Sequence, residues 1–161
     1  MQLATDALSG VVVGVAVTPS GSDAEQAPTM VEQVQQRAGR APRDYLMDGG
    51  FAAREQITAL EQRGIDVYAP VRLPKRRPEG ERYEPRSGDT AEVIRWRQRM
   101  ATDEAKAVYR QRAASAEWTN AQFRWRHGLH QFTVRGVDKT LSVVLLIAIA
   151  HNLLRWLPLS T

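Results

Sequence analysis

The strongest constraint on the fold is an alternation of strand-like and helix-like segments in the first half of the chain. Residues 44–48 form a short strand-like run that ends in a Gly-Gly turn, and residues 65–69 form a second one that is closed by Pro70. Between them, residues 52–63 have helical spacing and stop at Gly64. A strand, a helix and a second strand in this order are typical of a sheet that is covered by helices.

A β-hairpin is expected at the beginning of the sequence. Residues 11–18 are rich in β-branched side chains, and residues 2–5 alternate apolar and polar positions before the turn dipeptide Ser9-Gly10. A hairpin contributes antiparallel strands, and the later strands are joined through a helix. The chain therefore predicts an α/β fold with a mixed sheet flanked by helices, and its 161 residues are expected to form one domain.

Three further helices are expected. The first is capped by Ser22 or Asp23 and runs to about residue 38. A long helical stretch covers residues 90–127, with a break near Thr102 and Asp103, and a last helix covers residues 139–156. The apolar run of the last helix lasts only ten residues before His151, Asn152 and Arg155 follow, which favours a buried helix over a membrane span.

Positive charge is concentrated in one part of the chain. The formal net charge is +4, and residues 72–126 contain 14 Lys or Arg against 8 Asp or Glu. Of the 22 basic residues, 19 are arginines. Because the planar guanidinium of arginine matches phosphate oxygens, nucleic acid is a candidate partner. The alternative is a solvated, salt-bridged face. Residues 71–89 are rich in Pro, Arg and Glu and are expected to form a basic loop, insertion or arm.

The absence of cysteine excludes several kinds of site. Disulfides, thiolate catalysis and zinc sites built on sulfur are all ruled out. Residues 1–10 do not resemble a signal peptide, because they are neither basic nor apolar over a sufficient length. A cytoplasmic protein with no membrane partner is expected.

Asp48 is the first candidate for chemistry. It ends the strand-like run 44–48 and precedes Gly49 and Gly50, so its carboxylate is expected at the edge of the sheet, where ligand and metal sites are common. In the alternative interpretation, Asp48 stabilises the Gly-Gly turn or caps the next helix.

Glu117 and Arg124 form a second candidate pair. Seven residues are nearly two turns of an α-helix, so the two side chains are expected on one face. The carboxylate suits a metal ion and the guanidinium suits a phosphate. The alternative is an ordinary surface charge pair.

These features resemble the DDE domain of bacterial insertion-sequence transposases over nearly all of the chain. In that family, a late helix carries a Tyr, Arg, Glu, Lys signature. The residues that carry the resemblance are Tyr45-Leu46-Met47-Asp48-Gly49-Gly50-Phe51, then Tyr109, Arg112, Glu117 and Arg124, then Ala150-His151-Asn152 within the apolar segment 148–154.

The resemblance implies a ribonuclease-H-like fold in which strand one carries the first catalytic Asp, strand four the second and a late helix the Glu. The hairpin of residues 2–18 would correspond to strands two and three, so strand one and its Asp would lie upstream of Met1. On this basis the chain is expected to be a partial, truncated and inactive copy of the domain, with an incomplete sheet. Asp6 is a possible substitute for the missing carboxylate, and an ordinary hairpin-turn role is the alternative.

Two positions depart from the family pattern. Arg112 and Glu117 are five residues apart where four is the commoner spacing, and five residues turn about 140° around an α-helix. Arg112 is therefore not expected to face Glu117. The last signature position is Arg124 rather than Lys, which keeps the charge and the ability to bind phosphate.

The function implied by the resemblance is DNA transposition through metal-dependent phosphodiester cleavage and strand transfer. The metal ion would be Mg²⁺ or Mn²⁺, with Asp48 and Glu117 as catalytic ligands. The residues expected to contact DNA are Tyr109, Arg112, Arg124 and Arg126. Three tryptophans would either stack on bases or pack in the core, namely Trp96, Trp118 and Trp125. The expected partners are DNA, a second copy or a full-length transposase.

Two other classes of function stay open at this point. One is a non-catalytic DNA-binding or assembly module derived from a transposase, which needs no complete set of carboxylates. The other is a host metal-dependent nuclease of the same fold, which would need Asp6 to complete its site.

Overall fold

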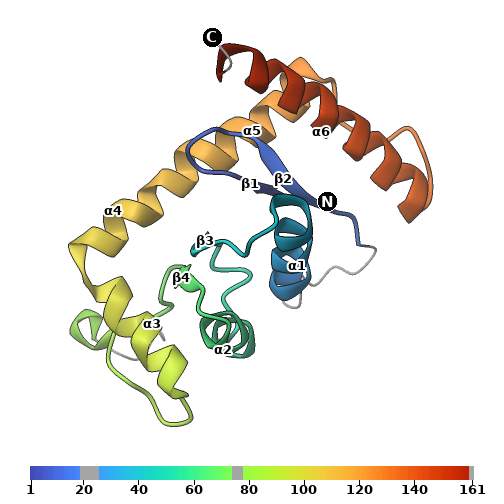
Figure 1. Ribbon diagram of the computed structural model, residues 1–161. Coiled ribbons are helices and arrows are strands. Elements are labelled where there is room, and N and C mark those ends of the chain that lie inside the picture. Colours follow the sequence, from blue (N-terminus) through green and yellow to red (C-terminus); the bar gives the residue numbers. More distant parts are fainter. Residues whose placement is uncertain (19–25, 74–77, 160–161) are drawn as a thin grey trace.

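The computed structural model describes residues 1–18, 26–73 and 78–159, and within these ranges the protein is a mixed α/β structure. Two small sheets lie at its centre, and a long helical run passes along one side of them (Figure 1). The last helix, α6, turns back beside the end of this run.

The N-terminal hairpin is confirmed. β1 (Gln2–Thr5) pairs antiparallel with β2 (Val12–Ala16), with Leu3 opposite Val15 and a register shift after Ala4. Gly10 closes the turn with a φ of 70°, a left-handed conformation that glycine adopts without a steric penalty. Its N–H donates to the Asp6 carbonyl.

The strand–helix–strand unit is also confirmed. β3 (Asp44–Leu46) and β4 (Asp66–Tyr68) are parallel neighbours, and α2 (Arg54–Gln62) connects them. Ile57 and Leu60 of α2 and Val67 of β4 are fully buried, so the helix covers the pair of strands.

The single mixed sheet expected from the sequence is not formed by the described residues. There, β1 and β2 make one two-stranded sheet, and β3 and β4 make another. Pairing between segments far apart in the sequence depends on tertiary geometry, which local patterns do not encode. The α/β class is therefore right, and an incomplete sheet is consistent with this arrangement.

Helix α1 (Gln26–Ala38) lies against the hairpin. The expected caps, Ser22 and Asp23, lie outside the described residues. Close approach of the helix depends on Gly14, because a Cβ at this position would overlap the Met30 thioether. The buried face of α1 has i, i+3, i+4, i+7 spacing and consists of Ala27, Met30, Val31 and Val34.

The long helical stretch breaks where the sequence predicted. α3 (Ala91–Ala101) ends before Thr102, and the Thr102 hydroxyl caps α4 (Asp103–Arg112) by accepting the Ala105 N–H at 3.2 Å. The helix then continues through two π-helical turns, η2 (Ala113–Glu117) and η3 (Gln122–Arg126), with the short helix α5 (Trp118–Ala121) between them.

The described part of the basic segment 71–89 is held by hydrogen bonds within the segment, and its end is attached to α3, where Arg97 donates to Asp89 at 2.7 Å. It contains one 3₁₀ turn, η1 (Glu79–Glu81). Arg82 donates to the Val71 carbonyl at 3.1 Å, and Arg86 donates to the Arg72 carbonyl at 2.9 Å.

Helix α6 (Val137–Leu159) is only partly buried, which corrects the expectation of a buried helix. Val144, Ala148 and His151 pack inward, whereas several large apolar side chains on its other side are exposed. The two-stranded hairpin is too narrow to cover more than one face. By length and composition α6 is the one helix, among the described residues, that could cross a membrane.

Two apolar cores result from this arrangement. The larger lies among α1, α2, α3 and the β3–β4 pair, and the smaller joins β2, the end of the long helical run and α6. Because the run contributes Trp96 to the first core and Phe123 to the second, it connects both halves of the molecule.

Candidate functional site

Asp48 lies two residues after the end of β3 and contacts the long helical run. Its Oδ2 is 3.2 Å from Nη2 of Arg112, and its Oδ1 accepts the Gly49 N–H at 2.6 Å. The bond to Gly49 shows that Asp48 does stabilise the Gly-Gly turn, as the alternative interpretation held. The pair with Arg112 joins two signature positions that are more than 60 residues apart.

Tyr109 completes this small cluster. Arg112 forms a side-chain hydrogen bond with the Tyr109 hydroxyl. Burial raises the pKa of Tyr109, and the nearby Asp48 carboxylate raises it further, whereas Arg112 acts in the opposite direction. The phenol is therefore neutral at neutral pH and keeps its proton available for donation.

The interval between Arg112 and Glu117 is π-helical, which corrects the geometry assumed from the sequence. A π-helix has about 4.4 residues per turn, so a five-residue step passes one full turn by roughly 50°, compared with about 140° for an α-helix. The angular offset between Arg112 and Glu117 is therefore smaller than the sequence implied. Ser115 supports the wider turn, because its hydroxyl donates to the carbonyls of Gln111 at 3.1 Å and Arg112 at 3.3 Å.

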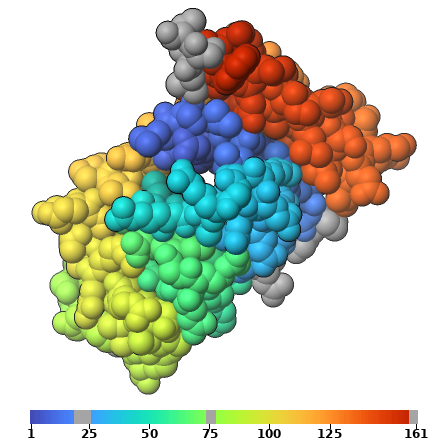
Figure 2. All heavy atoms as spheres, viewed as in Figure 1, coloured from blue at the N-terminus to red at the C-terminus, as the bar shows by residue number. Residues whose placement is uncertain are grey.

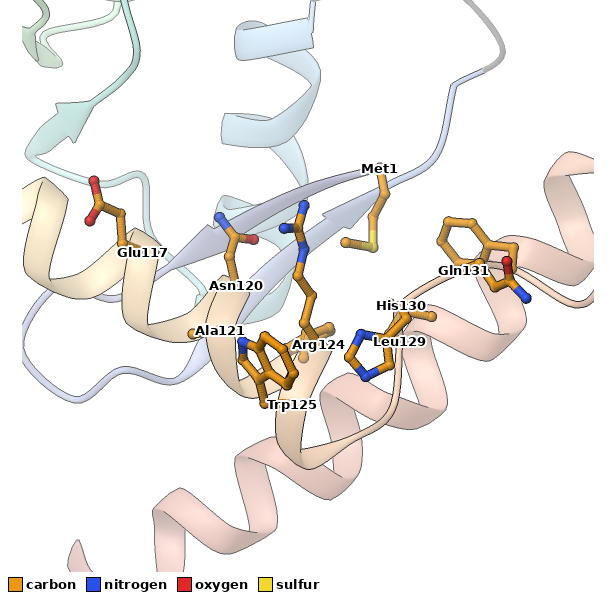
Figure 3. Close-up of a pocket in the computed structure, with 11 residues that line it drawn as sticks. Met1, Glu117, Asn120, Ala121, Arg124, Trp125, Leu129, His130 and Gln131 are labelled. Carbon is orange, nitrogen blue, oxygen red and sulfur yellow. The ribbon is translucent and has the colours of Figure 1, made fainter.

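Glu117 and Arg124 line the same open hollow. The hollow has a volume of about 620 Å³ and lies between the long helical run and residues 129–132. Figure 3 shows Asn120 and Arg124 projecting from the helix toward the Met1 end of the hairpin, with Glu117 one turn further along the helix. The remaining lining residues include Trp125, His130 and Gln131.

The three tryptophans named from the sequence have different surroundings. Trp96 is buried in the larger core. Trp118 packs between Arg155, whose guanidinium is 4.9 Å from its ring, and His151 at 5.6 Å. Trp125 is 79% exposed. Its one aromatic contact among the described residues is an edge contact with His130, with the two ring centroids 5.2 Å apart. Of these three tryptophans, Trp125 is therefore the most open to a ligand.

Asp6 is a turn residue in this structure. Its Oδ1 accepts hydrogen bonds from the Ser9 N–H at 2.7 Å and the Ser9 hydroxyl at 2.6 Å. Burial raises the pKa of Asp6, but the bonds from Ser9 outweigh it and leave the pKa below its usual range. This is the hairpin-turn role that was the alternative to a catalytic one.

The described residues do not form a metal site by themselves. Within residues 1–18, 26–73 and 78–159, no three Asp, Glu, His or Cys side chains are close enough together to hold a metal ion. The carboxylate of Asp48 is in addition paired with Arg112. The donors that the structure describes therefore do not by themselves complete a two-metal centre.

Sequence reasoning missed Asn120. It lies three residues after Glu117, on the same helical face, and its amide lines the hollow between Glu117 and Arg124. The helical spacing from Glu117 was the signal that could have identified it. Arg126 lines a smaller hollow of about 160 Å³ together with His127, His151 and Arg155.

The family model described as the transposase DDE domain matches residues 1–153. Neither the curated proteins nor the solved structures contain a significant match to the chain.

Proposed function

Because this chain belongs to the transposase DDE-domain family, we propose that it acts in DNA transposition by binding DNA along the helical stretch from Tyr109 to Arg126. The observation that carries this proposal is the exposed surface around Trp125. Arg124 lines the same hollow as Trp125, and Arg126 lines the smaller hollow beside it. Both arginines are exposed, and no carboxylate in the described part of the chain forms an ion pair with either of them.

The chemistry of this surface suits a DNA backbone. A guanidinium without a carboxylate partner is free to bind phosphate oxygens, and each phosphate that it neutralises releases condensed counterions. The amides of Asn120 and Gln131 line the same hollow as Arg124 and add hydrogen-bonding groups beside its guanidinium. Trp125 offers an open ring face on which a base can stack.

The test is DNA binding by a charge-reduced variant. We expect Arg124→Gln/Arg126→Gln to weaken binding of a fluorescent DNA duplex by at least about tenfold at low salt, measured by anisotropy. The matched control is Arg40→Gln/Arg95→Gln, which removes the same charge from exposed positions elsewhere. Equal weakening in both double variants would show that net charge, and not this surface, determines binding.

The catalytic part of the proposal concerns Asp48 and Glu117. We propose that they are metal-ligating carboxylates of the family's site, for Mg²⁺ or Mn²⁺, with Tyr109 and Arg112 holding Asp48 in position through the contacts described above. Since the described residues supply no third ligand, no cleavage step is assigned to the chain by itself.

The sheet arrangement supports a related proposal. We propose that the β1–β2 and β3–β4 pairs are two parts of one ribonuclease-H-like sheet whose connecting strand is not among the described residues. In the described part of the chain, each pair keeps an unpaired edge, and such edges accept further strands.

A non-catalytic DNA-binding or assembly role is the second candidate function. The observation that favours it is that the Asp48 carboxylate is paired with Arg112 while no three-ligand group is formed by the described residues. Such a module needs the basic surface around Trp125 but no metal ion.

A further inference from the structure

The smaller hollow, of about 160 Å³, lies where the end of the long helical run meets α6. Residues of α5, η3 and the position that follows η3 form one wall, and residues of α6 form the other. Figure 2 shows the orange and red atoms of α6 against the blue atoms of the hairpin. The lining of the hollow consists of Trp118, Gln122, Arg126, His127, His151, Leu154 and Arg155.

This lining carries positive charge without a counterion. Its polar groups are two guanidiniums, two imidazoles and one amide, and neither Asp nor Glu is among the lining residues. No carboxylate in the described ranges forms an ion pair with Arg126 or Arg155. A concave surface that holds charges of one sign attracts the opposite charge, so the hollow favours an anion.

Arg155 is fixed by contacts on two sides. Its Nε and Nη2 donate to the Ser9 carbonyl at 2.8 and 2.5 Å, and its guanidinium lies 4.9 Å from the centre of the Trp118 ring. Nη1 forms no hydrogen bond with any residue that the structure describes. Because the side chain is already ordered, binding of a ligand by Arg155 costs little conformational entropy.

Both imidazoles have hydrogen-bonding capacity that no described residue uses. His151 is 2% exposed and bonds the Gly10 carbonyl through Nε2 at 3.0 Å, which leaves Nδ1 without a partner among the described residues. Nε2 of His127 is buried and likewise has no hydrogen-bond partner there. Buried polar atoms without a partner are rare in native proteins, and a missing ion or water molecule is a common reason for them.

The surroundings of His127 lack a negative charge. Burial lowers the pKa of His127, and His151 and Arg126 lower it further. Arg155, on the α6 wall of the same hollow, is also a cation. The charged and titratable groups that line the hollow with His127 therefore all oppose its protonation, and an anion among them would reverse this effect.

We propose that the smaller hollow binds a phosphate group, with Arg126 and Arg155 as its cationic contacts. The hollow has roughly the volume of five water molecules, so a phosphate group fits into it and a whole nucleotide does not. Donors on both walls, including the Gln122 amide, suit a tetrahedral group whose oxygens point in several directions. A carboxylate, with two oxygens in one plane, uses fewer of them.

Two sources supply this chemistry, a phosphate of a DNA strand and free inorganic phosphate. The proposal does not rest on the DNA-binding proposal, although both include Arg126. Arg155, His127 and His151 lie outside the helical stretch proposed for DNA, and the larger hollow with Arg124 and Trp125 is separate from this one.

Isothermal titration of the purified chain with sodium phosphate at neutral pH tests the site, with the ionic strength held constant by sodium chloride. We expect a dissociation constant of about 1 mM or tighter, which rises at least about tenfold in Arg126→Gln. Arg40→Gln is the matched control, because Arg40 is also exposed and lines neither hollow. Its dissociation constant should change by less than about twofold.

The pKa of His127, followed by NMR of its ring protons, gives a second readout that needs no variant. Saturating phosphate should raise this pKa by at least about half a unit relative to chloride at the same ionic strength. The reason is that a bound anion favours the imidazolium, against the opposing effects of His151, Arg126 and Arg155.

Four results would overturn the proposal. They are no phosphate binding up to about 20 mM, equal weakening in Arg126→Gln and Arg40→Gln, a His127 pKa that phosphate does not change, and acetate binding as tight as phosphate binding. A chain that binds inorganic phosphate as expected but does not bind DNA would remove only the DNA-binding proposal.

Repeating the phosphate titration with a saturating short DNA duplex identifies the source of the phosphate. If the duplex abolishes the heat of phosphate binding, a phosphate of the DNA occupies the hollow. If the heat persists with DNA bound, the hollow takes free phosphate. Both results support a phosphate site, and the Arg126→Gln and Arg40→Gln variants check that the heat comes from this hollow.

Discussion

At the scale of single residues, Arg112 has the most informative surroundings. It contacts both Asp48 and Tyr109, so it connects the end of β3 to α4. Sequence reasoning identified all three residues through a family resemblance but could not predict that they touch. That contact depends on how the helix packs across β3 and β4, and no local pattern of the sequence specifies this packing.

His127 predicts a pH dependence of stability. Burial lowers its pKa below the ordinary 6.5, and the neighbouring His151 and Arg126 lower it further. Above pH 6.5 the ring is neutral in both the folded and the unfolded chain. As the pH falls through 6.5, the unfolded chain binds a proton first, so the free energy of unfolding should decrease.

Urea unfolding at two pH values, one above and one about a unit below 6.5, measures this effect. The parent chain should lose stability at the lower pH, and His127→Gln should lose less of it. If the variant has the same pH dependence as the parent, His127 is not the group responsible.

At the scale of elements, the helices and strands were largely predictable, whereas the π-helical turns and the division into two separate sheets were not. The Thr102 break and the end of α2 before Gly64 follow from capping and glycine signals that act within a few residues. The π-helical turn η2 differs from an α-helix by one residue per turn and has no such local signal. The one indication in the sequence was the five-residue spacing from Arg112 to Glu117, where four is the commoner spacing in the family.

The ion pair between Asp89 and Arg97 should be important for the position of α3. The two side chains are 0% and 4% exposed, and Arg97 Nε lies 2.7 Å from Asp89 Oδ2. Burial raises the pKa of Asp89, but bonds from Arg97 and the Arg86 N–H outweigh it and lower the pKa overall. We expect Asp89→Ala to cost about 3 to 5 kcal/mol, because it leaves Arg97 buried without its carboxylate.

Urea denaturation of Asp89→Ala, compared with the parent chain, gives this cost directly. Asp103→Ala is the matched control, because Asp103 pairs with Lys106 in an exposed i,i+3 contact and its loss should have a much smaller effect. Similar destabilisation in both variants would argue against a special role for the buried pair.

At the scale of the whole molecule, the described chain combines a basic surface with an incomplete set of carboxylates. The DDE-domain match covers residues 1–153, yet no group of three metal-ligating side chains occurs within the described ranges. We therefore expect that the purified 161-residue chain will not nick supercoiled DNA with Mg²⁺ or Mn²⁺.

Agarose-gel analysis of supercoiled plasmid tests this expectation. Metal-dependent nicking that is abolished by both Asp48→Asn and Glu117→Gln would contradict it. Such a result would mean that the chain still assembles a working metal site, for which Asp6 is the candidate third ligand.

The salt dependence of DNA affinity tests most directly whether this surface binds DNA. We predict that the logarithm of the binding constant of the parent chain falls linearly with the logarithm of salt concentration. For Arg124→Gln/Arg126→Gln the slope should be shallower by about 1.8, which corresponds to about 0.9 for each lost phosphate contact. Binding that does not change with salt, or a slope that is equal in the parent and the variant, would contradict DNA recognition by this surface.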